Sequence, residues 1–366
     1  MRVLVLTLGT RGDLELFLAL ARELCSRGHE VVLASSGFYA DAVSAAGVEF
    51  TAVGSGTRDE LLTVLRGMSA ISDRAERTRL YARQWLRPQF HAGRAQLGAL
   101  GTSSDYFVSN IKVGLERNGA LVQSASVTYD PPWRIDDLAR YGPRDPGGAV
   151  LDLVALPRKL VDPAHEWGEQ FRFTGFWWSD TDGAARGDLA DFVAAGPPPV
   201  VLTLGSMAMA DAAHVVPLVT AAARRARRRC VVVRGWTVSH IAEEPDVFVT
   251  SEALYDWLFP RACCVIHHGG TGTVAAALRS GVPSIVLPQI TCQELFGCML
   301  EREHLAAGVF GDNITLPELA ATIDRAATDP AIAASVRIWQ TAVRADGGVA
   351  RAADLIEAHA ARPRSE

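Results

Sequence analysis

The sequence lacks the features that mark several large classes of protein. No apolar run in its 366 residues is long enough to span a bilayer, and residues 1–9 are too short in their apolar part for a signal peptide. The net charge of −5 provides no attraction for nucleic acid or for an anionic membrane. The arginine-rich stretch 224–229 ends a predicted helix, where cations are favoured, so we expect a solvated helix end there.

Cysteine is also scarce, and its spacing excludes a disulfide framework or a metal cluster. The chain has six cysteines, of which only Cys263 and Cys264 are neighbours, in a stretch expected to be a buried strand. Isolated thiols are typical of reduced proteins, so we expect a cytoplasmic location. With 49% hydrophobic residues, the composition is that of a soluble globular protein of about two domains.

The apolar pattern predicts two series of alternating strands and helices, which indicates an α/β fold with parallel sheets. The first series begins at residue 3, and the second follows the prolines at 197–199. We therefore expect two facing, Rossmann-like, doubly wound domains, with residues 1–178 and 200–366 joined by a linker at 179–199. The last helical segment, 348–361, could pack on either domain. Such folds bind ligands at the carboxyl ends of their strands.

A glycine-rich turn with two histidines is the strongest local signal. Residues 267–273 read His-His-Gly-Gly-Thr-Gly-Thr and separate a β-branched run from an alanine-rich stretch expected to be a helix. Glycines let the backbone approach a ligand, and the free N–H groups of a first helical turn point at an anion. The imidazoles add donors that a phosphate can use. This segment predicts a site for a phosphate or diphosphate ester.

The first turn of the chain, residues 9–15, carries a carboxylate that would repel a phosphate. It lacks the Gly-x-Gly-x-x-Gly spacing, and Ser35 follows the second strand in place of an acid for a ribose hydroxyl. Both differences argue against an NAD or FAD site. Asp13 has two interpretations: it is the N-cap of the following helix, or it is a general base that faces the cleft.

Several motifs stand in an order that is informative as a set. They are residues 10–15, 174–177, 204–207, 256–261, 267–273 and 281–283. Together they resemble the inverting nucleotide-sugar glycosyltransferases of the GT-B fold (family 1), in the bacterial branch that decorates antibiotics and other natural products. The resemblance covers residues 1–54 and 173 to about 361.

The resemblance implies roles around the donor nucleotide. Asp13 matches the catalytic base, which takes the proton of the acceptor hydroxyl. The residues that match diphosphate-binding positions are His267, Gly270, Thr271, Gly272, Thr273, Ser206 and Thr10. The nucleobase side corresponds to Ala253, Leu254 and Trp257, although a structural tryptophan is an equal alternative for Trp257.

Two departures from the family pattern concern the sugar and the acceptor. Relatives carry an acid and a glutamine at the donor-sugar position, where this chain has Cys292, Gln293 and Glu294. Loss of the acid at Cys292 favours a deoxygenated or amino sugar, unless Glu294 compensates. The segment 131–148 is shorter than in relatives, which indicates a more open pocket or a smaller acceptor. By position, the acceptor-side residues are Arg11, Trp85, Asn110 and Trp133, with packing an equal alternative for both tryptophans.

The implied reaction moves a sugar from a dTDP- or UDP-sugar to a hydroxyl of a small natural-product acceptor, with inversion. The glycine-rich turn stabilises the leaving diphosphate, and the cleft holds both substrates together. We expect no metal, because the helix dipole and a histidine replace it and no Asp-x-Asp pair is placed to hold one. The nucleotide sugar is a co-substrate, and no other cofactor is expected.

The expected partners are the nucleotide sugar and the acceptor, with no nucleic acid and no integral membrane, in a monomer or homodimer. Two alternatives remain open. One is an enzyme resembling a sugar-nucleotide 2-epimerase, against which residues 10–15 argue. The other is a catalytically impaired homologue that binds a donor or a partner protein, which the cysteine at position 292 leaves possible.

Overall fold

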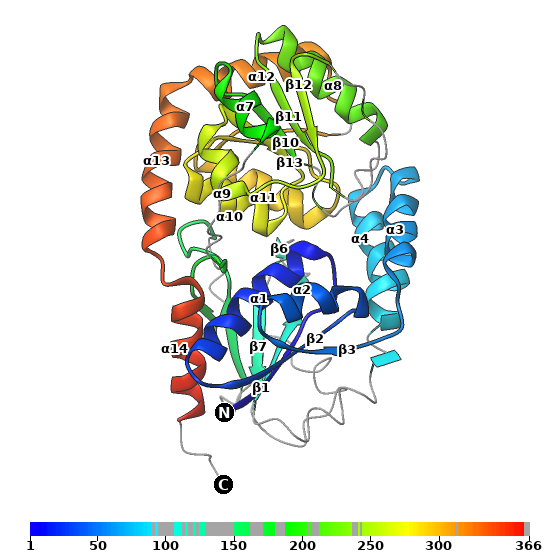
Figure 1. Cartoon of the computed structure of the whole chain (residues 1–366), viewed down its shortest axis with the longest axis vertical. Coiled ribbons are helices and arrows are strands. Elements are labelled where there is room, and N and C mark those ends of the chain that lie inside the picture. The colour runs from blue at the N-terminus through cyan, green and yellow to red at the C-terminus, as the bar shows by residue number, and fades with distance from the viewer. Residues whose placement is uncertain are drawn as a thin grey trace. The chain divides into compact units, whose positions relative to one another are not determined.

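Two compact units make up the chain in the computed structural model (Figure 1). Unit 1 comprises Met1–Leu61, Ala82–Ser179 and Asp346–Glu366, and unit 2 comprises Leu62–Tyr81 and Asp180–Ala345. Compared with the expected domains, unit 2 gains a segment from the first quarter of the chain, and unit 1 gains the last helix. The structure describes residues 1–89, 92–93, 106–111, 114–115, 120–121, 124–128, 150–161, 171–179, 187–203, 205, 212–235, 241, 244–311 and 313–361.

Unit 1 contains a seven-stranded sheet with the order β3-β2-β1-β4-β7-β8-β9. Its strand pairs are parallel except those of β7, which is antiparallel to β4 and to β8. The expected parallel sheet is wrong at this strand, because the connection from β4 to β7 contains the hairpin β5–β6 and leaves no room for a helical crossover. The strands are β1 (Arg2–Leu6), β2 (Glu30–Ser35), β3 (Glu49–Ala52), β4 (Tyr106–Ile111), β5 (Gly114–Leu115), β6 (Ala120–Leu121), β7 (Ser124–Thr128), β8 (Val150–Val154) and β9 (Phe171–Phe173).

Helix α1 (Arg11–Ser26) packs on β1 and β2 through an apolar stripe. Leu14, Leu20 and Leu24 are buried, and the ring of Phe17 meets the edge of Trp177 at 5.7 Å. Helix α1 is therefore amphipathic, with its apolar side against the sheet. Other described helical elements of unit 1 include the 3₁₀ turn Gly37–Tyr39, α2 (Ala40–Ala45), the π turn Ala82–Leu86 and α14 (Gly348–Ala360).

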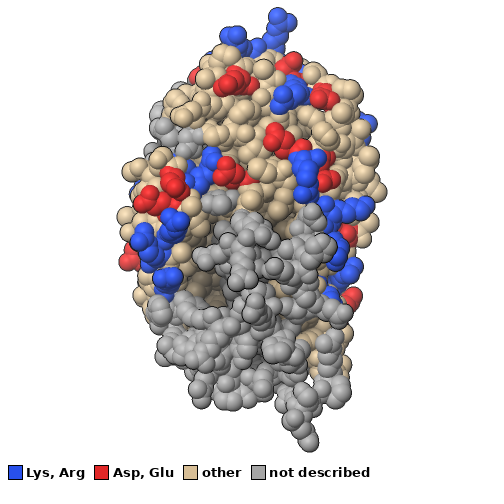
Figure 2. Space-filling model, turned by 180° about the vertical axis from the view of Figure 1, so that it is seen from behind, with Lys and Arg blue, Asp and Glu red and all other residues tan. Residues whose placement is uncertain are grey.

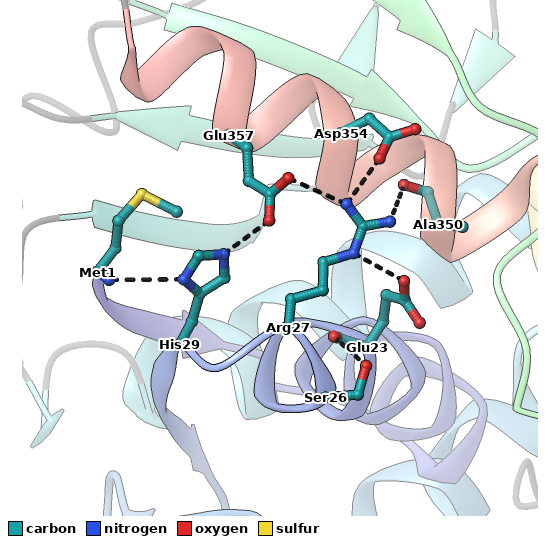
Figure 3. Close-up of polar contacts among 8 residues, drawn as sticks. All are labelled: Met1, Glu23, Ser26, Arg27, His29, Ala350, Asp354 and Glu357. Carbon is teal, nitrogen blue, oxygen red and sulfur yellow. Dashed lines mark hydrogen bonds and ion pairs between the residues drawn. The ribbon is translucent and has the colours of Figure 1, made fainter.

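The last helix, α14, is fixed to the end of α1 by a cluster of charges (Figure 3). The Arg27 guanidinium donates to Glu23 at 2.8 Å, to Asp354 at 2.6 Å and to Glu357 at 3.0 Å. Glu357 also contacts Nε2 of His29 at 2.8 Å. Because one guanidinium joins carboxylates from both helices, the C-terminal segment is held on unit 1 by directed bonds as well as by apolar packing.

Glu357→Gln should weaken this cluster in a pH-dependent way. The pKa of Glu357 is lowered by its hydrogen bond with His29 and then by Arg27. A carboxylate with a lowered folded-state pKa stabilises the fold above its unfolded pKa and loses that effect as the pH falls through the folded value. The side chain is 37% exposed, so we expect a loss of about 0.5–1 kcal/mol in the free energy of unfolding at pH 7.

The difference between Glu357→Gln and wild type should begin to shrink below the unfolded pKa of a glutamate, about 4.3, and should vanish as the pH falls through the lower folded value and the wild-type carboxylate becomes protonated. Urea unfolding at neutral and acidic pH measures this directly. Glu49→Gln, at an exposed carboxylate on β3, is the matched control and should change stability little at either pH. An effect of Glu357→Gln that is equal at both pH values would contradict the ion-pair explanation.

Unit 2 contains a six-stranded parallel sheet with the order β12-β11-β10-β13-β14-β15. From β10 the chain winds outward to one edge, and from β13 it winds outward to the other. Thr203 at the end of β10 is therefore the register partner of His267 at the end of β13. Ligands of doubly wound folds bind at this switch point. The strands are β10 (Val200–Thr203), β11 (Cys230–Val233), β12 (Val247–Thr250), β13 (Cys264–His267), β14 (Ser284–Val286) and β15 (Ala306–Val309).

Helix α7 (Asp188–Ala194) lies within residues 179–199, which were expected to be a linker. Val193 belongs to the core of unit 2, and the Phe192 ring packs on Phe248 with 5.4 Å between ring centroids. Apolar side chains therefore tie this part of the segment to the sheet of unit 2. Other helices that the structure describes include α3 (Arg58–Gly67), α4 (Arg74–Tyr81), α8 (Ala212–Arg225), α9 (Tyr255–Leu258), α10 (Thr271–Ser280), α11 (Thr291–Arg302), α12 (Leu316–Thr328) and α13 (Pro330–Ala345).

Charges of both signs are interspersed on the described surface in Figure 2. The end of α8 is an example, since Arg224 pairs with Asp246 at 2.8 Å and also with Glu244. This arginine-rich stretch is thus an ion-paired helix end, in keeping with the sequence expectation. Among the described residues, no helix combines the length and the apolar character needed to cross a membrane.

Candidate active site

The glycine-rich turn at the switch point of unit 2 has the geometry of an anion site. Helix α10 begins directly after β13 with Gly270 as its N-cap, and the Val274 N–H donates to the Gly270 carbonyl at 2.9 Å. The N–H groups of the first turn have no acceptor within the helix and carry the positive end of its dipole. Gly269 has φ +87°, and a Cβ there would lie 2.8 Å from the Gln293 carbonyl oxygen. Glycine is therefore required at position 269.

His267, the last residue of β13, lies inside the unit. Its side chain is 0% exposed, and its Nδ1 accepts the Gly269 N–H at 3.0 Å. Burial, with a smaller effect from His268, lowers the pKa of His267 to about 3. The ring is therefore neutral at pH 7 with its proton on Nε2, which is buried and has no hydrogen-bond partner in the described part of the chain.

His268 lies between two glycine turns. A Cβ on Gly205, after β10, would lie 2.7 Å from the His268 Cε1, and a Cβ on Gly270 would collide with the His268 Nε2. The residue is 7% exposed, and burial lowers the pKa of its imidazole to about 4. The ring thus brings a neutral donor or acceptor to the place where the turns from β10 and β13 meet.

The turn after β10 approaches its neighbours closely. Gly205 and Gly235 have φ +59° and +61°, and a Cβ on Gly235 would collide with the Gly205 carbonyl oxygen. Only glycine fits such a contact, which keeps the backbone next to His268 free of side chains. Ser206, the residue predicted to touch the diphosphate from this turn, lies outside the described residues.

Asp13 lies at the carboxyl end of β1, the strand paired with β4 at the switch point of the sheet in unit 1. Its Oδ2 accepts the Thr10 N–H at 2.9 Å and lies 3.3 Å from the Thr10 hydroxyl. Thr10 is the N-cap of α1, so the interpretation of Asp13 as the N-cap is wrong. Asp13 is the third helical residue, whose carboxylate bonds back to the cap, because the helix begins earlier than the sequence indicated. Both residues are less than 10% exposed.

The residues predicted to lie beside the nucleobase pack partly against the core of unit 2. Trp257 and Ala253 are partly buried against the core of unit 2, and Leu254 is 37% exposed. The Arg261 guanidinium lies 4.6 Å from the centroid of the Trp257 ring, which is a cation–π contact. Trp257 therefore has a structural role in the free protein, and its contact with a nucleobase stays a prediction.

The predicted donor-sugar residues follow β14 at the start of α11. The Gln293 Oε1 accepts the backbone N–H groups of Gln289 at 2.8 Å and of Ile290 at 3.3 Å. Glu294 forms an ion pair with Arg74 at 2.7 Å, and Cys292 is partly buried. Gln293 and Glu294 are therefore engaged with protein groups, and contact of any of the three side chains with a sugar stays a prediction.

Arg74 and Arg77 are residues that sequence reasoning did not find. They reach this turn from α4 through hydrogen bonds to Pro288 and Gln289. The only signal in the sequence was an arginine-rich helical stretch, which does not specify a partner more than 200 residues away. Within the described residues, no group of three His, Cys, Asp or Glu side chains could hold a metal ion.

The predicted acceptor-side residues are described only in part. Arg11 is exposed and pairs with Glu15 at 3.0 Å. Trp85 is 1% exposed and lies 6.3 Å from the Phe38 ring, which is the environment of a core residue. Asn110 is in β4 but its side chain is not described, and Trp133 lies outside the described residues, as does the short segment 131–148.

Comparisons with known proteins agree with this architecture. The N-terminal domain model of glycosyltransferase family 28 matches residues 3–94. O-mycaminosyltylonolide 6-deoxyallosyltransferase of Streptomyces fradiae is 32% identical over 416 residues, covering 98% of this chain and 97% of the relative. Vancomycin aglycone glucosyltransferase of Amycolatopsis orientalis is 28% identical, covering 98% of each chain. The solved structure of CalG4, the calicheamicin glycosyltransferase, superimposes with a TM-score of 0.68 at 19% identity, covering 100% of this chain and 99% of that one.

The two α/β units with switch-point turns define a GT-B protein, and the solved structures share that fold. The chain belongs to the bacterial natural-product glycosyltransferase family. Its alignment with the Streptomyces fradiae relative is longer than the 366 residues of this chain, so the relative contains segments with no counterpart here. The shorter length expected from the sequence is therefore observed, and its assignment to residues 131–148 stays a prediction.

Proposed function

We propose that this glycosyltransferase moves a sugar from a dTDP- or UDP-linked donor to a hydroxyl of a small natural-product acceptor, inverting the anomeric centre without a metal ion. The observation that carries the proposal is the glycine-rich turn at residues 267–273 of unit 2, the anion turn. There the N-terminus of α10 and a neutral imidazole meet at the switch point of the sheet. The relatives support the substrate class, since one is a 6-deoxyallosyltransferase and another a vancomycin aglycone glucosyltransferase. A structural neighbour, VinC, was solved with dTDP.

The diphosphate leaves as the acceptor oxygen attacks the anomeric carbon. The N–H groups in the first turn of α10 and an imidazole donor stabilise its growing negative charge. The reaction therefore does not require a metal ion. Both nitrogens of His267 are enclosed, with Nδ1 bonded to Gly269 and Nε2 buried. His268 also has a buried Nδ1 without a partner among the described residues, but its ring lies between the Gly205 and Gly270 turns. We therefore assign the direct contact to His268, and His267 supports the turn through Gly269.

Asp13 takes the proton of the acceptor hydroxyl in the same step. The new O–C bond forms while the bond from the anomeric carbon to the diphosphate oxygen breaks, and the proton passes to the carboxylate. The Thr10 N–H holds Oδ2 in a fixed direction, which orients the base. Attack from the face opposite the leaving group accounts for inversion.

Thermal shifts with UDP, dTDP, GDP and NAD test the donor class. A ligand that binds only the folded state raises the unfolding midpoint, by an amount equivalent to about 2.7 kcal/mol at a hundred times its Kd. We expect stabilisation by UDP or dTDP, and stabilisation by NAD alone would contradict the proposal. Release of nucleoside diphosphate from a dTDP- or UDP-sugar, unchanged by EDTA, distinguishes a working transferase from an impaired homologue.

A further inference from the structure

Helix α4 (Arg74–Tyr81) comes from the first quarter of the chain but belongs to unit 2, where it packs on α11. Arg74 makes three contacts there, donating to the Pro288 carbonyl at 3.2 Å, to the Glu294 carboxylate at 2.7 Å and to the Phe310 carbonyl at 3.4 Å. Its side chain is only 17% exposed. A guanidinium with its donors spread over three acceptors fixes all three in position.

Arg77, one turn further along α4, contacts the same part of unit 2. It is 3% exposed, and it donates to the Gln289 carbonyl at 3.3 Å and to the Ile71 carbonyl. The turn at residues 288–293 is thus bonded to α4 through two of its carbonyls. Within the same turn, the Gln293 Oε1 accepts the backbone N–H groups of Gln289 and Ile290.

This turn adjoins the anion turn within unit 2. The strands that precede the two turns, β13 and β14, are neighbours, and Gly269 lies so close to Gln293 that a Cβ would meet its carbonyl oxygen at 2.8 Å. A sugar attached to a diphosphate at the anion turn has residues 288–293 as its neighbouring backbone. The position of that turn therefore affects the binding of the sugar, whereas the binding of the diphosphate depends on the N-terminus of α10.

We infer that Arg74 is a positioning residue for the donor sugar, an inference that rests on the proposed function. It fixes the turn at residues 288–293 and keeps the Glu294 carboxylate in an ion pair. In this arrangement Glu294 does not supply the acid that is missing at Cys292. Without Arg74, a carboxylate and two carbonyls lose their common donor, and the turn is free to shift.

The test compares the binding of nucleotides with and without a sugar. For wild type and Arg74→Gln, isothermal titration gives Kd for UDP, UDP-glucose, dTDP and dTDP-glucose. We expect Kd for the free diphosphates to stay within about twofold of the wild-type value, because α10 is untouched. The ratio of the sugar-nucleotide Kd to the diphosphate Kd should change about tenfold, which is the effect of losing one hydrogen bond to a charged group. Arg79→Gln, at an exposed arginine of the same helix, is the control and should leave the ratio unchanged.

Rescue separates positioning from general loss of structure. Arg74→Lys keeps a cation that can donate to Glu294 and to the carbonyls, and it should return the ratio toward the wild-type value. The inference would be overturned if Arg74→Gln left the Kd ratio unchanged for both nucleotides. It would also be overturned if the variant weakened the binding of diphosphate and of sugar nucleotide equally. Wild-type protein that binds neither UDP nor dTDP would instead contradict the proposed function.

Discussion

Asp13→Asn should lower kcat for glycosyl transfer about 10²–10⁴-fold, the usual contribution of a general base. Affinity for UDP or dTDP should stay within about twofold, because the anion turn belongs to the other unit. The amide oxygen of asparagine can still accept the Thr10 N–H, so the start of α1 is preserved. The measured loss then reports the missing base and not a frayed helix.

The control is Glu15→Gln, which removes an exposed carboxylate two residues further along α1. Glu15 forms an exposed ion pair with Arg11 at 3.0 Å, so the change should leave kcat within about twofold. Melting midpoints for both variants should lie near that of wild type. Transfer by Asp13→Asn at the wild-type rate would show that Asp13 serves α1 alone.

His268→Ala should weaken the binding of UDP or dTDP about 10- to 100-fold, the effect of losing a hydrogen bond to a charged group. The imidazole lies between Gly205 and Gly270, where two turns meet at the switch point. His267→Asn should produce a smaller change in affinity, because His267 is enclosed and its first task is to accept the Gly269 N–H. An asparagine oxygen retains that acceptor.

Isothermal titration on folded protein separates these two histidines. Equal weakening by both variants would mean that the diphosphate reaches His267 after a rearrangement. A larger effect of His267→Asn than of His268→Ala would return the direct contact to His267. Circular dichroism of each variant shows whether the sheet of unit 2 is intact before affinities are compared.

The elements around the anion turn were predictable because local chemistry specifies them. Three apolar residues before His267 form a strand with it, glycines permit the turn at Gly269, and alanines extend α10. The position of Asp13 near a strand end was predictable in the same way. Its exact helical position was not, because Thr10 and Asp13 are both good residues for a helix start and only their hydrogen bonds distinguish them.

The directions of the two adjacent imidazoles could not be read from the pattern. Residues at the end of a strand alternate between faces, but whether His267 or His268 faces a ligand depends on which backbone lies beside each ring. In the structure, Gly205 from a different strand lies against His268, and Gly269 bonds to His267. Gly205 lies beside His268 because β10 and β13 are neighbours in the sheet, and Gly269 lies beside His267 because of the conformation of the turn. No periodic pattern in the sequence indicates either contact.

By itself, the sequence determined the α/β class, most strands, the glycine-rich turn at 267–273 and the position of the candidate base near a strand end, since each depends on residues close together in the chain. Only the tertiary structure decided the reversed strand β7, the attachment of α14 to α1 and the bonds from Arg74 to the turn at 288–293. Each of these joins segments whose separation in sequence carries no information about their contact. Long-range packing selects such partners because only the folded chain brings an arginine within hydrogen-bond distance of carbonyls from a distant segment.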